Sequence, residues 1–88
     1  MLLGKVVGNV VSTKKVHGLV GYKLLLVKPL YEDDGGVVVA VDKLGAGQGE
    51  TVIVTTGPSV SFAYDEDIPA DAIVIGIVDE EPNLPNYS

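Results

Sequence analysis

The stretch VVVAVDKLGAGQGETVIVTT, residues 37–56, decides how the rest of the chain can be placed. It begins with VVVAV and ends with VIVTT, and such runs of β-branched residues are typical of strands. The glycine-rich segment GAGQG, residues 45–49, lies between the two runs. The stretch therefore predicts two strands, over 37–42 and 51–56, joined by a loop of glycines.

Three more strands are expected on either side of this unit, over residues 2–11, 22–27 and 72–78. Glycines interrupt the first of them, which indicates a bend or a close approach of another backbone. Small barrels need such bends in order to close. A short helical turn is expected within 60–71. Five strands with so little helix predict an all-β fold, a small five-stranded OB-like β-barrel.

The size and composition of the chain indicate one domain that gains stability by association. The chain has 88 residues, 47% of them hydrophobic, and no cysteine. A domain of this size buries a limited core, and without cysteine it forms neither disulfides nor thiolate metal sites. Such a chain often oligomerises. We expect a barrel domain over 1–79 and an extended tail over 80–88.

Charge is distributed unevenly along the chain. The net charge is -6, with six lysines and no arginine. The chain is basic up to Lys43 and strongly acidic after it, which suits either an ordinary solvated surface or edges of opposite sign that meet in an assembly. No apolar run approaches the ~20 residues that span a bilayer, so we expect a soluble intracellular protein without a membrane partner.

The apolar residues of three strands do not alternate with polar ones. The segments 24–27, 37–41 and 73–75 are apolar at consecutive positions, so both faces of these strands carry apolar side chains. A barrel covers only its inner face, and the chain lacks helices to cover the outer one. Because buried apolar surface contributes ~25 cal/mol per Å², we expect another copy or another protein to cover the outer faces.

No catalytic, cofactor or metal site is expected. The glycine loop leads into a strand, whereas a dinucleotide loop leads into a helix whose N-terminus holds the pyrophosphate. His17 is the only histidine and there is no cysteine, so no second ligand of the usual kind completes a transition-metal site. A serine nucleophile needs an adjacent base held by a third group, and only His17 could be that base by the usual route, so turn and cap roles are expected for the serines. A small-ligand or nucleic-acid-binding barrel remains the alternative function. Nucleic acid is disfavoured because the chain is acidic and lacks arginine and tryptophan.

Four segments resemble one known family. They are GNVVST (8–13), GYKLLLVKPL (21–30), VAVDKLGAGQGETVIVTTG (39–57) and DAIVIGIVD (71–79). They are similar to the bacterial microcompartment vertex family, the pentameric shell proteins of carboxysomes and of ethanolamine- and propanediol-type organelles. The resemblance covers nearly the whole chain up to Asp79.

The resemblance implies a structural protein that is not an enzyme and needs no cofactor or metal. Members of the family are barrels of the oligonucleotide-binding type, and five copies form a truncated pyramid. The expected partners are therefore four further copies, in a homopentamer, and the hexameric facet proteins of the shell. The expected location is cytoplasmic, in the shell of a microcompartment.

The family motif places subunit contacts on the glycine loop and the strand after it. The residues expected at the subunit interface or at the five-fold axis are Leu44, Gly45, Ala46, Gly47, Gln48, Gly49, Glu50, Gly57 and Ser59. Family members commonly continue from this strand with a Gly-Ser-Ser-Ala-Arg-like run, whereas this chain has GPSVS, residues 57–61. Any contact that the family arginine makes is therefore absent here.

Overall fold

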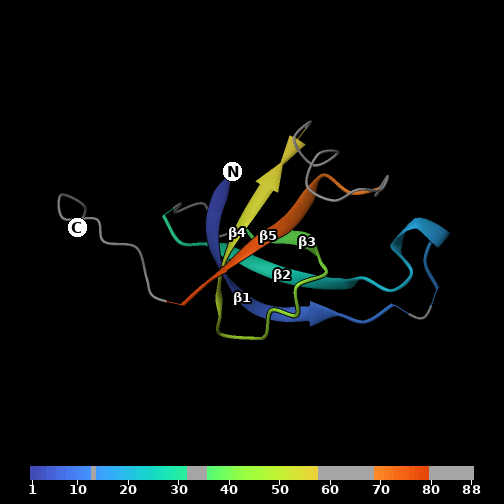
Figure 1. Ribbon diagram of the computed structural model, residues 1–88, viewed down its shortest axis with the longest axis horizontal. Coiled ribbons are helices and arrows are strands. Elements are labelled where there is room, and N and C mark those ends of the chain that lie inside the picture. The colour runs from blue at the N-terminus through green and yellow to red at the C-terminus, as the bar shows by residue number, and fades with distance from the viewer. Residues whose placement is uncertain (13, 32–35, 58–68, 80–88) are drawn as a thin grey trace.

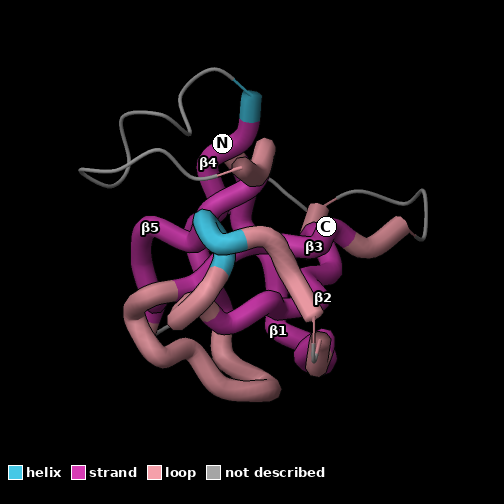
Figure 2. The backbone as a smooth tube through the Cα atoms, turned by 90° about the vertical axis from the view of Figure 1, so that its right-hand side faces the viewer, coloured by secondary structure: helices cyan, strands magenta, loops and turns pink. Residues whose placement is uncertain are grey.

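The computed structural model describes residues 1–12, 14–31, 36–57 and 69–79, and these contain five strands. The strands are β1 (Leu2–Val10), β2 (Lys23–Pro29), β3 (Val38–Asp42), β4 (Thr51–Thr56) and β5 (Ala72–Val78). They close into one barrel in the order β1-β2-β3-β5-β4 (Figures 1 and 2). The predicted five-stranded barrel is confirmed, and the predicted strand ends agree with the observed ones to within two residues.

Helix is almost absent from the described part of the chain. The 3-10 turn η1 (His17–Leu19) lies between β1 and β2, and Gly57 at the end of β4 is also in 3-10 conformation. Most of the segment 60–71, where we expected a short helical turn, lies outside the described residues, as does the tail 80–88. Nothing helical in the described segments has the length and apolar character needed to cross a bilayer.

The strand β1 bends so that it can pair with two neighbours. Leu2 to Lys5 pair with β4 and Gly4 to Val10 pair with β2, both antiparallel. The register with β2 shifts between Val6 and Gly8, and a bulge of this kind bends a strand and increases its twist. On the other side, a parallel bridge between Val41 and Ile73 joins β3 to β5. The bend in β1 lets so small a sheet close on itself.

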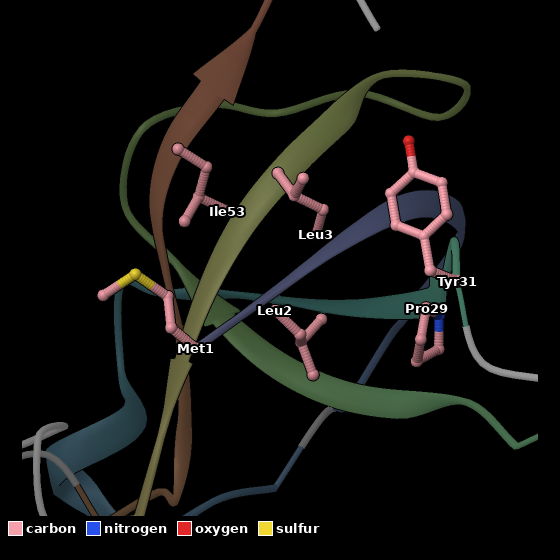
Figure 3. A pocket seen from close by; sticks show the side chains of 6 residues that line it. All are labelled: Met1, Leu2, Leu3, Pro29, Tyr31 and Ile53. Atoms are coloured by element: carbon pink, nitrogen blue, oxygen red, sulfur yellow. The ribbon is translucent and has the colours of Figure 1, made fainter. Parts of the chain in front are cut away.

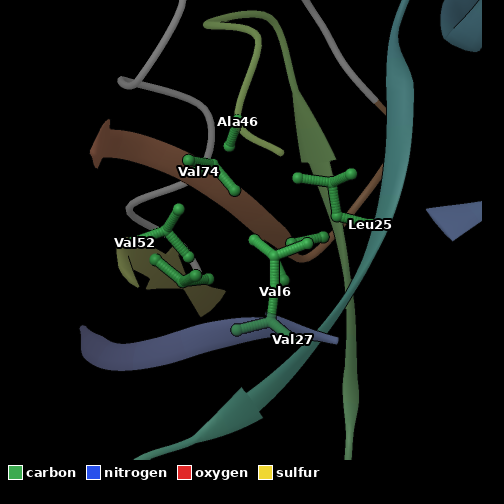
Figure 4. Close-up of a cluster of buried hydrophobic side chains, with 9 residues drawn as sticks. Val6, Leu25, Val27, Ala46, Val52 and Val74 are labelled. Atoms are coloured by element: carbon green, nitrogen blue, oxygen red, sulfur yellow. The ribbon is translucent and has the colours of Figure 1, made fainter. Parts of the chain in front are cut away.

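The core is built from small and medium-sized aliphatic side chains that point into the barrel (Figure 4). They are Val6, Leu25, Val27, Ala40, Ala46, Val52, Val54, Ala72 and Val74. They alternate along β2 and β4, as expected for strands with one face inside a barrel. Narrow β-branched residues suit the short distance between facing strands of a small barrel.

Gly4 on β1 leaves no room for a side chain beside β2. An added Cβ at this position would overlap Cγ1 of Val27 and would lie 3.1 Å from the carbonyl oxygen of Lys28. The glycine predicted to mark a bend is therefore required for close packing. The absence of a side chain here makes room for the buried side chain of Val27.

The outer face of the barrel is only partly covered by the chain itself. Val41 and Ile73 point outward but are buried beneath the loop that contains η1, mainly by Leu19 and Tyr22. The expectation that another molecule must cover every outward apolar side chain is therefore wrong at these two positions. It is right that apolar side chains remain exposed elsewhere, since Val39 on β3 is 51% exposed.

Candidate functional site

The glycine loop 44–50 is held by a buried carboxylate at the end of β3. Asp42 is 1% exposed, and its two carboxylate oxygens accept hydrogen bonds from three backbone amides. These come from Leu44 (2.8 Å), Gly45 (3.1 Å) and Ala46 (2.8 Å). Successive amides turned toward one anion form a nest, and hydrogen bonds to a charged group are stronger than neutral ones. The loop therefore has a defined shape before any partner binds.

Further contacts fix the loop across the end of the barrel. Ala46 packs into the core, and the ammonium group of Lys23 donates to its carbonyl oxygen at 3.2 Å. The loop then returns along β1, where the amide of Gly49 donates to Val6 at 2.8 Å and the amide of Val6 donates to Glu50 at 2.9 Å. The loop thus closes one end of the barrel as well as forming part of the surface.

Two glycines of the loop have backbone angles that favour glycine. Gly45 has φ +89° and Gly49 has φ +91°. Residues with a side chain rarely adopt these backbone conformations, so glycine is favoured at both positions. Gly47 differs, because its φ is ordinary and its amide donates to the Glu50 carboxylate at 2.7 Å. A side chain at Gly47 therefore fits the backbone of the isolated chain.

The predicted interface residues fall at two ends of one strand. Leu44, Gly45, Gln48, Gly49 and Glu50 are exposed in the loop before β4, and Gly47 is half-buried there. Gly57 follows β4, has φ +68° and is exposed, and its amide donates to the carbonyl oxygen of Asp71 at 3.1 Å. The six residues of β4 separate these ends by about 20 Å.

One member of the predicted set is buried inside the barrel, and another lies outside the described residues. Ala46 is buried in the core of its own barrel, so its side chain is not available to a neighbouring subunit. Ser59 lies outside the described residues. Of the remaining predicted residues, those of the loop precede β4 and Gly57 follows it, so they lie at opposite ends of this strand and do not form one cluster.

An apolar groove lies beside β1 and β4, where the outward-facing Leu3 and Ile53 meet Leu2 and Pro29 on the core side of their strands. It has a volume of about 600 Å³ and is lined by Met1, Leu2, Leu3, Pro29, Tyr31 and Ile53 (Figure 3). Leu3 and Ile53 are paired in register across the two strands, so their side chains lie on the same face. This groove was absent from the residues predicted from the sequence. The available signal was Ile53 itself, an outward apolar residue between the core residues Val52 and Val54.

Comparison with known proteins identifies the relatives of this barrel. The family described as ethanolamine utilisation protein EutN/carboxysome matches residues 1–79, which is most of the chain. The chain belongs to this family. The family named from the four sequence segments is thereby confirmed.

Members of the EutN/carboxysome family resemble the chain over almost their whole length. The microcompartment shell vertex protein GrpN of Rhodospirillum rubrum is 51% identical, covering 90% of this chain and 93% of GrpN. The shell vertex protein EutN of Escherichia coli K12 is 45% identical, covering 91% of this chain and 88% of EutN. The solved structure of R. rubrum GrpN, described as a pentameric microcompartment shell protein, superposes with a TM-score of 0.79 and 47% identity over 96% of this chain and all of that one.

Proposed function

We propose that this chain is a structural vertex protein, which forms pentamers that cap the five-fold corners of a bacterial microcompartment shell. The observation that carries the proposal is the similarity to GrpN, a pentameric shell protein, over the complete barrel. Carboxysome vertex proteins are also similar, so the likeness extends across shells of different kinds. The proposed location is in the microcompartment shell, and the proposed role is architectural and not catalytic.

Geometry explains why such a shell needs pentamers in addition to hexamers. A layer of hexamers is flat and cannot close without pentamers at its corners. We propose that the pentamer meets hexameric facet proteins at those corners. Within the ring, each subunit contacts the next through two different surfaces, because a cyclic pentamer has heterologous interfaces.

The glycine loop is proposed as one part of the subunit contact. Its residues Leu44, Gln48 and Glu50 are exposed, and the nest around Asp42 fixes their positions in advance. A preformed loop loses less conformational entropy on association than a mobile one. Gly57, at the other end of β4, is proposed as a second contact. The alternative of a ligand- or nucleic-acid-binding barrel gains no support from the relatives, which are named as shell vertex proteins.

The native mass of the purified chain tests the proposal directly. Light scattering or native mass spectrometry near neutral pH should give five times 9.2 kDa, about 46 kDa. Co-expression with a hexameric facet protein should then give closed polyhedral particles. A stable 9.2 kDa species at the concentrations used for assembly would contradict the proposal.

A matched pair of variants tests the placement of the glycine loop. Gly47→Lys should prevent assembly if the loop crowds a subunit contact, because a charged side chain would have to be buried there. The substitution should not unfold the barrel, since an added Cβ lies no closer than 3.4 Å to the Glu50 carboxylate. His17→Lys adds the same side chain at an exposed site on η1 and serves as the control. A Gly47→Lys pentamer as stable as the control would contradict the placement.

A further inference from the structure

We propose that a recess at the η1 end of the barrel binds a small anion with a phosphate group, either inorganic phosphate or a phosphate monoester. The recess lies where β1 ends and β2 begins, two strands that the loop with η1 connects (Figure 1). It has a volume of about 200 Å³ and is lined by Asn9, Val10, Val11, Ser12, Lys15, Tyr22, Lys23 and Leu24. The proposal goes beyond the architectural role and does not depend on the pentamer.

The recess is basic although the chain as a whole is acidic. All of its lining residues come from the segment 1–31, which contains five lysines and no aspartate or glutamate, while the net charge of the chain is -6. Two of these lysines line the recess, Lys15 from the loop and Lys23 from the start of β2. A hollow lined by charges of one sign raises the local concentration of ions of the opposite sign. The recess therefore favours an anion.

The groups around the recess add to its positive charge. Lys43 follows β3, and its Nζ atom lies 5.8 Å from the centroid of the Tyr22 ring, which is a cation–π distance. Asp42 pairs with Lys23 across β2 and β3, but its carboxylate is 1% exposed and accepts hydrogen bonds from three amides of the glycine loop. This carboxylate therefore serves the loop and does not line the recess.

The position of Lys23 is fixed before an anion binds. Its ammonium group donates to the carbonyl oxygen of Ala46 at 3.2 Å, which uses one of the three N–H donors of an ammonium group. Lys23 and Asn9 also line a second recess, of about 120 Å³, that reaches Gly47 and Gln48 of the glycine loop. A side chain already held by one hydrogen bond loses less conformational entropy when it binds a ligand. The glycine loop thus prepares one of the two lysines for an anion.

The size and lining of the recess indicate a phosphate group with at most a short apolar substituent. The recess is smaller than the ~300–1,000 Å³ of pockets that hold drug-sized ligands. Val10, Val11 and Leu24 form an apolar wall beside the two lysines. A phosphate monoester carries about two negative charges near neutral pH and three acceptor oxygens, and lysine is a common phosphate binder. A carboxylate has a single charge, so two ammonium groups would hold it less strongly.

Titration of the full-length chain with inorganic phosphate and with ethyl phosphate tests the proposal. Isothermal titration calorimetry measures both affinities at constant ionic strength, because added salt screens exposed charges. Lys15→Gln should weaken the binding of both anions at least about tenfold, since it removes a charged hydrogen-bond donor. Lys28→Gln removes the same charge from an exposed position on β2 outside the recess, and it should bind both anions like the unchanged chain. Both lysines are exposed, so neither substitution should unfold the barrel.

Two results would overturn the proposal. One is that neither anion binds more tightly than acetate at the same ionic strength. The other is equal binding by Lys15→Gln and Lys28→Gln, which would mean that the anions respond to net charge alone. Where both anions bind and Lys15→Gln weakens them, their relative affinity identifies the source: tighter binding of ethyl phosphate indicates an ester that contacts the apolar wall, and otherwise the ligand is the free ion. The native mass tests the proposed architectural role separately, so a failed titration leaves that role unaffected.

Discussion

Gly4→Ala should destabilise the barrel strongly although it adds only one methyl group. The new Cβ would overlap Cγ1 of Val27, a fully buried side chain of the core, and would lie 3.1 Å from the carbonyl oxygen of Lys28. The oxygen belongs to the backbone of β2, so it cannot move without disturbing the pairing of β1 with β2. Overpacking of this kind costs about 1–3 kcal/mol. Because the new Cβ would meet both a buried side chain and the backbone, the cost is at the upper end of this range, about 3 kcal/mol. Removing a glycine from a strand returns about 0.5–1 kcal/mol, which leaves a net loss of about 2 kcal/mol.

Gly8→Ala on the same strand is the matched control. An added Cβ there would lie 3.6 Å from Cδ1 of Leu26, which is an ordinary contact, and Gly8 does not have a positive φ. The lower chain entropy of the unfolded state should leave this variant unchanged or more stable by about 0.5 kcal/mol.

Thermal unfolding of both variants at one protomer concentration measures the difference, because assembly makes stability depend on concentration. A loss of about 2 kcal/mol should lower the Tm of Gly4→Ala by about 10 °C, whereas that of Gly8→Ala should not fall. Equal Tm values for Gly4→Ala and Gly8→Ala would refute the argument that a side chain at position 4 overlaps β2.

Two further predictions concern the glycine loop, and urea unfolding at fixed protomer concentration measures both. Asp42→Asn should lower the free energy of unfolding by about 2 kcal/mol, because one amide oxygen cannot replace two carboxylate oxygens that accept hydrogen bonds from three backbone amides. The control Asp71→Asn, at an exposed position, should change the free energy of unfolding little. An Asp42→Asn variant as stable as Asp71→Asn would show that the nest does not hold the loop. Gly49→Ala should lower the free energy of unfolding by about 1 kcal/mol, because the φ of Gly49 is +91°. Gly47→Ala should not lower it, because the φ of Gly47 is ordinary. Equal losses in the two variants would contradict the conformational argument.

The barrel could be predicted because its strands are marked by local chemistry. β3 and β4 follow directly from valine and isoleucine runs on either side of a glycine loop. β2 ends at Pro29, which lacks an amide for the ladder, and Gly4 lies where a bend was expected. These signals depend on neighbouring residues alone, so a single sequence contains them.

The candidate site was harder to predict from the sequence because it depends on pairing between distant segments. Leu3 and Ile53 form one floor only through the register of β1 with β4, which no local pattern fixes. Ala46 was expected at a subunit contact because the family motif places the whole loop there, yet the three hydrogen bonds to Asp42 turn the loop so that its side chain enters the core. The cover over Val41 likewise arises from a loop whose sequence is polar and turn-like. In each case the tertiary contact decides what is buried.

One strand shows how this small chain divides its apolar residues between folding and assembly. Val52 and Val54 of β4 point inward and are fully buried, so they stabilise the barrel. Ile53, between them, points outward beside Gly76 and lines the groove. Because successive residues of a strand face opposite sides, β4 can contribute to the core and to the outer surface without compromise between the two. Substitutions at Val52 should therefore lower the stability of the barrel more than substitutions at Ile53, which lies outside the core cluster.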